Sequence, residues 1–195
     1  MIEKIHTYED GLTRCHWPKQ NREYLDYHDK EWGVEVRDDE ELFEHLSLEG
    51  FQAGLSWITI LQRRDEFRKA FKGFEVDKVA RFGETQIERL MQNPGIIRNR
   101  AKINAVINNA RLIKTLDRPL NEIIWEHAPK KKLQRVSLKN FEWRATSPES
   151  EALSKSLRAL GFAFVGPTSM YAMMQSIGMV NDHAPGCFRR EQLRD

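Results

Sequence analysis

Cysteine is scarce in this chain, which has two cysteines among 195 residues. In an intracellular chain we do not expect two cysteines to form a structural disulfide, because the compartment is reducing. The chain also lacks any run of about 18 apolar residues, which excludes a membrane-spanning helix, and its start, MIEKIHTYEDGL, lacks the apolar core of a signal peptide. We therefore expect a cytoplasmic protein with no membrane partner, whose cysteines bind a metal, act in catalysis or are buried.

Internal repeats, low-complexity tracts and a strong excess of one charge are absent as well. The formal net charge is +2, with 40% hydrophobic and 31% charged residues. These values are typical of a globular chain rather than a disordered one, and the length suits a single domain over residues 1–195. The basic stretches IIRNRAK and KKKLQR permit a nucleic-acid partner but do not identify one.

Strand-like alternation is rare and helical periodicity recurs, so the predicted fold class is all-α. The clearest helix begins after Asp38, which forms a capping-box pattern with Glu41. Its apolar positions are Leu42, Phe43, Leu46, Ala53 and Trp57. Further helices are predicted over residues 58–71, 76–83, 85–92, 100–116, 120–127, 147–161 and 168–178. We expect the remaining long stretch, residues 129–147, to be a surface connection.

Each cysteine has a histidine within reach along the chain. Twelve residues separate Cys15 from His28, and three separate His183 from Cys187. Two thiolates and two imidazoles satisfy tetrahedral zinc with no open position, which is typical of a structural site. On spacing alone an alternative is equally open, in which the cysteines are small buried hydrophobes and the histidines are incidental. If the two pairs meet, the metal joins the ends of the chain.

A carboxylate interrupts the apolar face of the helix that follows Asp38. Glu49 lies three residues after one buried position and four before the next. It is therefore paired with a buried Arg or His, protonated, at the edge of the apolar stripe, or facing a polar ligand in a pocket. Large aromatic side chains are unusually dense in this part of the sequence: Trp17, Tyr27, Trp32 and Trp57. Glutamate among aromatics suits a flat ligand with hydrogen-bond donors, although each aromatic alone is explained equally well as core.

A tight turn at Pro94 and Gly95 separates two helical stretches, and the second begins with Arg98, Arg100 and Lys102. Exposed backbone amides and these cations form an anion site that suits a phosphate of DNA. An ordinary helical hairpin with a solvated basic end explains the same pattern.

Six segments together carry a family resemblance: RCHW, YHDKEWGV, LFEHLSLEGFQAGLSWITIL, GIIRNRAKINAVINNA, ALSKSLRALGFAFVGPT and GMVNDHAPGC. In this order they resemble the bacterial 3-methyladenine-DNA glycosylases I, over Arg14 to Cys187. The resemblance implies a helix-hairpin-helix fold with one structural zinc that joins the N- and C-terminal segments, 15–28 and 183–187. It implies hydrolysis of the N-glycosidic bond of 3-methyladenine in alkylated double-stranded DNA by a monomer, which leaves an intact abasic strand.

The resemblance also assigns roles to residues of this sequence. Cys15, His28, His183 and Cys187 match the zinc ligands, with Asp182 as support. Glu49 matches the acceptor of hydrogen bonds from the base, Trp57 its stacking partner, and Tyr27 and Trp32 further pocket residues. Gly54 and Leu55 match a loop that wedges into the duplex. Gly95, Ile96, Arg98, Arg100 and Lys102 lie in the hairpin that matches the DNA-backbone contact.

Some positions and functions stay open. His16 competes as a metal ligand, and neither residues 130–147 nor the residues before Arg14 have an assigned role. Lys102 is the one candidate for a Schiff-base nucleophile, against which the resemblance argues. Two other functions fit the same sequence: a non-catalytic zinc-containing DNA-binding domain, and a related glycosylase with a different base preference.

Overall fold

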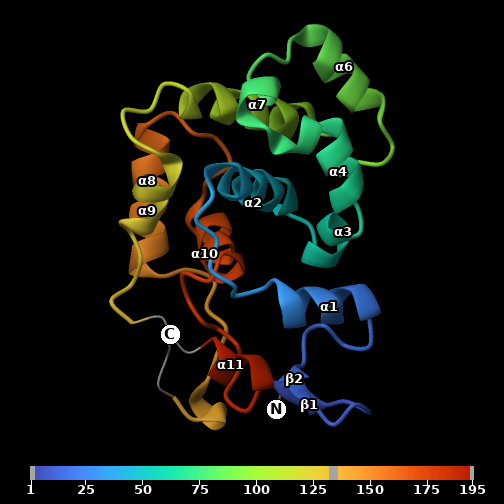
Figure 1. Cartoon of the computed structure of the whole chain (residues 1–195), viewed down its shortest axis with the longest axis vertical. Helices are drawn as coiled ribbons and strands as arrows, with labels where there is room; N and C mark the ends of the chain where they lie inside the picture. Colours follow the sequence, from blue (N-terminus) through green and yellow to red (C-terminus); the bar gives the residue numbers. More distant parts are fainter. Residues whose placement is uncertain (1–2, 132–135, 194–195) are drawn as a thin grey trace.

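The computed structural model describes residues 3–131 and 136–193, and these are mostly helical (Figure 1). The longer helices are α1 (Arg22–Lys30), α2 (Asp39–Gln52), α4 (Arg64–Ala70), α6 (Glu84–Gln92), α7 (Arg100–Ile113), α9 (Pro148–Ala159) and α10 (Pro167–Ser176). The shorter ones are α3 (Trp57–Leu61), η1 (Lys72–Phe74), α5 (Val76–Val79), α8 (Leu120–Trp125), η2 (Leu138–Asn140) and α11 (Phe188–Gln192). Within these described ranges, no helix has the length and apolar character needed to cross a membrane.

A small antiparallel sheet of β1 (Ile5–Thr7) and β2 (Thr13–Cys15) departs from the all-α prediction. Each strand has three residues, and Ile5 pairs with Cys15. Strands this short cannot show the alternation of buried and exposed residues on which a sequence prediction depends. The short helix α11 packs against β2, so the two ends of the chain lie side by side (Figure 1).

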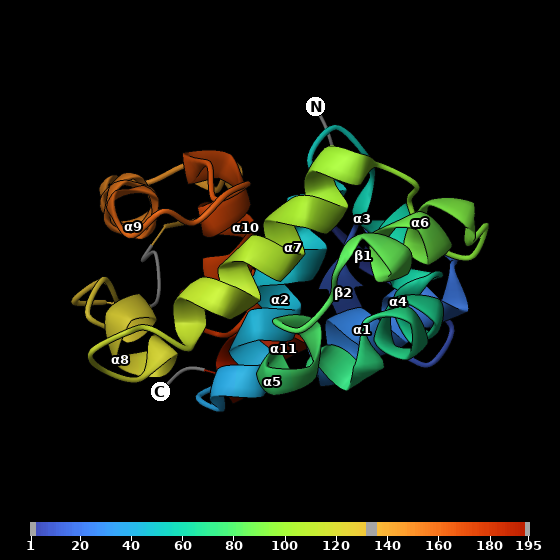
Figure 2. The ribbon, with the colours of Figure 1, turned by 90° about the horizontal axis from the view of Figure 1, so that it is seen from above.

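Helix α2 lies at the centre, and α3, α7, α8 and α10 pack around it (Figure 2). The predicted cap is confirmed, because the side chain of Asp38 accepts hydrogen bonds from the backbone N–H groups of Glu40 and Glu41, both at 3.0 Å. The predicted extension through Ala53 and Trp57 is wrong. The helix ends at Gln52, since the chain turns at Gly54 with φ +81°.

Most of the other predicted helices are confirmed to within a few residues. The exceptions are the helix predicted over residues 58–71, which is divided into α3 and α4 at Gln62 and Arg63, and the unpredicted helices α1 and α11. Arg63 has φ −110° and ψ 1°, outside the helical region, which breaks the hydrogen-bond ladder at that point.

Two buried clusters form the interior. The larger surrounds α2, while the smaller contains Cys15, Tyr27, Trp32, Leu61, Phe141, Ala184 and Cys187. Phe141 is fully buried, so the prediction that residues 129–147 are only a surface connection is wrong for this part, and residues 132–135 lie outside the described chain. The smaller cluster therefore joins segments from four parts of the sequence, at residues 15–32, 61, 141 and 184–187.

A close backbone approach fixes the segment after α1 against the end of α10. Gly178 has φ +72°, and a Cβ atom there would lie 2.6 Å from the carbonyl oxygen of Gly33. The backbone N–H of Val36 donates to the carbonyl of Ile177 at 3.1 Å. Only glycine fits at position 178. The contact fixes Gly33 and with it the position of Trp32, the residue immediately before Gly33.

Candidate functional site

A cavity of about 230 Å³ lies between α1, α2, α3, α10 and the segment before α9. Aromatic side chains form much of its wall and a single acid lies within it. The lining residues are Trp17, Tyr24, Tyr27, Trp32, Glu49, Gln52, Trp57, Trp143, Arg144, Ala172 and Gln175. A concave, aromatic wall with few polar groups is typical of a site for a flat organic ligand.

Glu49 is the acid in this cavity, and its side chain is buried with the residue only 3% exposed. Among the described residues its carboxyl group makes no hydrogen bond or ion pair, and Oε2 is fully enclosed. Burial without a partner disfavours the charged form and raises the pKa of Glu49 to about 8. The alternative in which Glu49 pairs with a buried Arg or His is thus not observed in the part of the chain that the structure describes.

Trp57 provides a second unpartnered polar atom in the same wall. Its Nε1 is buried without a hydrogen-bond acceptor in the described chain, and its ring packs at 5.5 Å from the ring of Tyr27. Burial, reinforced by the charge of Glu49, raises the pKa of Tyr24 to about 12 and holds that of Tyr27 well above its usual value. Both phenols therefore remain protonated donors. The cavity wall thus contains two polar groups, the carboxyl of Glu49 and the indole N–H of Trp57, that have no hydrogen-bond partner among the described residues.

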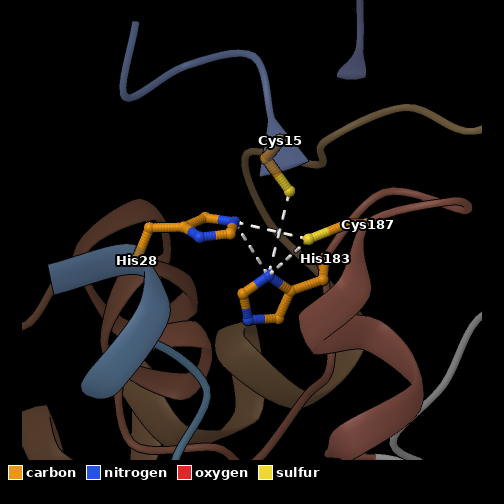
Figure 3. A group of neighbouring side chains, drawn as sticks. All are labelled: Cys15, His28, His183 and Cys187. Atoms are coloured by element: carbon orange, nitrogen blue, oxygen red, sulfur yellow. Dashed lines mark hydrogen bonds between the residues drawn. The ribbon is translucent and has the colours of Figure 1, made fainter. Parts of the chain in front are cut away.

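Cys15, His28, His183 and Cys187 meet in a second buried group, with their four ligating atoms within 4.8 Å of one another (Figure 3). The two imidazole nitrogens are 3.2 Å apart, Cys187 Sγ is 3.5 Å from each, and Cys15 Sγ is 3.8 Å from His183 Nδ1. The four side chains come from β2, α1 and the segment before α11. This group can hold a metal ion.

The outer nitrogens of both imidazoles have partners in the protein. His28 Nδ1 lies 2.7 Å from a carboxylate oxygen of Asp29, and His183 Nε2 lies 3.1 Å from the carbonyl oxygen of Trp32. Arg14 in turn donates to Asp29. These contacts orient the rings so that the other nitrogen of each faces the centre of the group.

The pKa values of the two thiols in this group are shifted in opposite directions. Burial raises the pKa of Cys15 well above its ordinary value, whereas hydrogen bonds with Cys15, His183 and His28 lower the pKa of Cys187. Ionising both thiols in this buried place requires a positive ion between them.

The competing ligand His16 lies outside the buried group. Its Nδ1 is 3.3 Å from a carboxylate oxygen of Glu3, near His6, in an exposed cluster on the terminal hairpin. His16 therefore does not replace any of the four buried ligating residues.

The predicted hairpin lies between α6 and α7, which pack against each other. Ile96 is buried, whereas Arg98 is exposed. Gly95 packs closely on Glu66, and its N–H is already bonded to the side chain of Asn93 at 2.8 Å. Arg100 forms ion pairs with two acids of α6. Of the three cations in the pattern, Arg98 is thus the one that has neither an ion pair nor a side-chain hydrogen bond among the described residues.

The expectation that Lys102 presents its charge to DNA disagrees with the structure. Lys102 is 7% exposed, and its Nζ donates to the carbonyl oxygens of Phe51 at 2.8 Å and Ala53 at 2.6 Å. It thereby satisfies carbonyls at the end of α2, and burial lowers its pKa. The loop it holds carries Gly54 and Leu55, and the side chain of Leu55 is exposed at 41%.

Sequence reasoning missed several residues of the pocket wall: Tyr24, Gln52, Trp143, Arg144 and Gln175. Tyr24 lies one helical turn before Tyr27 on α1, so a prediction of α1 would have found it. Trp143 is fixed by a hydrogen bond from its Nε1 to the carbonyl of Asp182 at 3.0 Å. That contact depends on the tertiary fold, and no local pattern indicates it.

A mostly helical chain with an aromatic pocket around a buried acid belongs to the class of proteins that hold a flat, hydrogen-bonding ligand. Comparison with known proteins defines the family. The family model described as methyladenine glycosylase matches residues 17–190, and the chain belongs to this family.

Named relatives agree with this assignment. The chain is 43% identical to DNA-3-methyladenine glycosylase 1 of Escherichia coli (strain K12) over 90% of its length and 96% of that protein. It resembles a crystal structure of a 3-methyladenine DNA glycosylase I with a TM-score of 0.84 and 43% identity, over 90% of this chain and 98% of that one. The glycosylase I of Staphylococcus aureus, solved to show the basis of its 3-methyladenine recognition, matches with a TM-score of 0.81 and 30% identity, over 91% and 96% of the two chains.

Proposed function

We propose that this protein excises 3-methyladenine from alkylated double-stranded DNA by hydrolysis of the N-glycosidic bond. The single observation that carries the proposal is the carboxyl group of Glu49, buried without a partner in an aromatic cavity of about 230 Å³. The family membership and the names of the relatives support the same substrate.

The pocket chemistry suits this base. In DNA, 3-methyladenine carries a positive charge that is delocalised over a flat ring. The indole of Trp57 and the ring of Tyr27 provide aromatic faces, and Trp32 closes the wall; such faces favour a desolvated cation by about 2 kcal/mol. Glu49 accepts a hydrogen bond from the exocyclic amine, and the positive base restores the ionised form of its carboxylate.

The leaving group explains how little catalytic machinery is needed. A cationic base departs as a neutral molecule, so its glycosidic bond is already weak. Binding and orientation by Glu49 and the aromatic wall then supply the acceleration. Lys102 donates to two carbonyl groups and has a lowered pKa in a closed place, which supports simple hydrolysis with an intact abasic strand over a Schiff base.

DNA binding uses exposed residues in the loop after α2 and in the turn before α7. Flipping a nucleotide costs a few kcal/mol, and the exposed side chain of Leu55, next to Gly54, offsets part of this by filling the gap in the duplex. The turn at Gly95 and Ile96, with Arg98 exposed beside it, serves as a helix-hairpin-helix contact to the DNA backbone. Arg100 contributes to this contact when it exchanges its ion pairs with two glutamates of α6 for the DNA backbone. The chain acts as a monomer formed by one domain.

We further infer that Cys15, His28, His183 and Cys187 hold one zinc ion. Ligands at ordinary zinc distances lie about 3.3 to 3.8 Å apart at the corners of a tetrahedron. In this group four of the six distances measure 3.2 to 3.8 Å, and all lie within 4.8 Å. Four protein ligands leave no position for water. The ion would supply stability by joining the two ends of the chain, with no part in the reaction.

Analysis of the released bases tests the proposal directly. DNA treated with a methylating agent is incubated with stoichiometric protein, and the free bases are separated and identified. We expect 3-methyladenine as the main product, with the strands intact. Absence of any free base would indicate the non-catalytic DNA-binding alternative, and a different main product would indicate another base preference.

A further inference from the structure

A second cavity, of about 420 Å³, adjoins the base pocket through a shared residue. Arg144 lines both. The second cavity also carries the cations Lys130 and Lys131 and is completed by Pro129, Ser147, Glu149, Tyr171, Val180 and Asp182. Three cations line this second cavity, and one of them also lines the base pocket. We call them the Arg144 track: Lys130, Lys131 and Arg144.

The cations of this track are free to bind a ligand. All three are exposed, and within residues 3–131 and 136–193 none of them forms a hydrogen bond or an ion pair. Arg100 differs, since it forms ion pairs with Glu84 and Glu88. An unpaired guanidinium at the edge of a cavity is available for a planar, two-pronged contact with an anion.

Two acids face the same cavity, and one of them is already engaged. Asp182 is buried and accepts hydrogen bonds from the hydroxyl of Tyr171 at 2.7 Å and from Gln175 at 2.9 Å. Glu149 is half-buried in the first turn of α9, where a carboxylate is favourable. The track therefore keeps a net positive charge toward solvent.

The exposed position of Arg144 at the cavity that contains Glu49 indicates which anion it binds. A positive guanidinium repels a cationic base, so Arg144 is poorly suited to contact the base itself. A nucleotide that places its base in the pocket leaves its sugar and phosphates at the rim. An arginine at that rim therefore meets a phosphate when the base is inside.

We propose that the Arg144 track binds phosphates of the DNA strand that carries the flipped nucleotide, with Arg144 on a phosphate next to that nucleotide. This inference rests on the proposed function, because it requires a flipped base in the pocket. It gives a role to residues from the segment 129–147 and adds a second DNA contact to the one at Arg98.

The salt dependence of DNA binding measures the contact. The probe is a fluorescent duplex with one tetrahydrofuran abasic-site analogue, titrated by anisotropy over a series of salt concentrations. Each phosphate contact contributes about −0.9 to the slope of log K against log salt concentration. For Arg144→Gln we expect the slope to become shallower by about 0.9 and Kd to rise roughly 3- to 10-fold at low salt.

Lys155→Gln provides the matched control, since it removes the same charge from an exposed position of α9 that lines neither cavity. Its slope should equal that of the parent. Lys130→Gln with Lys131→Gln should make the slope shallower again, by up to about 1.8. Thermal unfolding of each variant checks that the fold is retained.

A second readout separates a phosphate contact from a base contact. Binding of free 3-methyladenine, followed by quenching of the pocket tryptophans, should be the same in Arg144→Gln as in the parent. An unchanged salt slope for Arg144→Gln would overturn the proposal. So would a loss of affinity for free 3-methyladenine without a change of the slope. If the parent binds the duplex and Arg144→Gln alters the slope but the parent releases no base, the track stands and the glycosylase activity fails.

Discussion

The base pocket and the Cys/His group are neighbours in the same buried region, yet their polar atoms differ in whether they have hydrogen-bond partners inside the protein. In the Cys/His group the outer nitrogens of both imidazoles have partners, at Asp29 and at the carbonyl of Trp32. In the pocket Glu49 Oε2 and Trp57 Nε1 have none among the described residues. A buried polar atom without a partner costs about 1 to 3 kcal/mol. The imidazoles of the Cys/His group are thus satisfied within the protein, whereas two polar groups that line the pocket are not.

The two regions are also physically joined. The ring of Trp32 packs at 4.5 Å from His183 and that of Trp17 at 5.2 Å from His28, while both tryptophans line the pocket. Tyr27 and His28 are adjacent on α1. Whatever fixes the imidazoles therefore also fixes part of the aromatic wall.

The largest effect should follow from removing a metal ligand. We expect Cys187→Ala to lower the zinc content from one ion per chain to nearly none and to reduce the free energy of unfolding by about 5 kcal/mol, because binding to a structural site contributes directly to folding. Metal analysis of the purified protein and denaturant unfolding measure both.

A double variant tests whether the thiols act through one ion. If Cys15 and Cys187 bind the same metal, Cys15→Ala should cost little more once Cys187 has been replaced, whereas independently packed thiols give additive losses. A parent protein that is stable and active without bound metal would refute the zinc proposal.

A smaller effect should come from the pH dependence of Glu49. Its pKa in the folded protein is about 8, above the ordinary 4.5. Well below pH 4.5 the carboxyl group is neutral in both states, so its ionisation makes no contribution to the free energy of unfolding. As pH rises toward 8 the unfolded chain releases the proton and the folded chain keeps it, so stability falls, by up to about 4 kcal/mol.

Comparison with Glu49→Gln isolates this effect, since the amide does not titrate. The parent and the variant should have similar stability near pH 4.5, and the variant should become the more stable as pH rises to 8. Glu41→Gln, an exposed change on the same helix, should leave the pH profile of the parent unaltered. Parallel profiles for the parent and Glu49→Gln would show that Glu49 has an internal partner.

Sequence reasoning located most of the fold where helices are long and periodic. It placed Glu49 on the buried face correctly, because the spacing within α2 holds up to Gln52. It failed for Trp57, which belongs to α3 and reaches the pocket by way of the turn at Gly54. The apolar residues of α2 and α3 have the spacing expected of one continuous helix, although the two helices are separate.

The remaining errors concern contacts that form between distant segments. The charge of Lys102 predicted a DNA contact, but only the packing of α7 on α2 shows that its ammonium group reaches the carbonyls at the end of α2. Likewise, the burial of Phe141 depends on the small cluster around Cys15 and Cys187. Local patterns carry no information about such partners.

The smallest of these effects concerns ligand binding, and it decides whether the unsatisfied atoms of the pocket serve the base. Glu49→Gln keeps the shape of the side chain and removes its charge, so it weakens the hydrogen bond from the exocyclic amine without opening a cavity. We expect excision of 3-methyladenine to fall about 10- to 100-fold, which corresponds to about 1.4 to 2.7 kcal/mol. Single-turnover excision and competition by free 3-methyladenine measure this loss, with Glu41→Gln as the control. Unchanged competition by the free base would mean that Glu49 does not contact it, and the contrast between a satisfied Cys/His group and a ligand-seeking pocket would then rest on Trp57 alone.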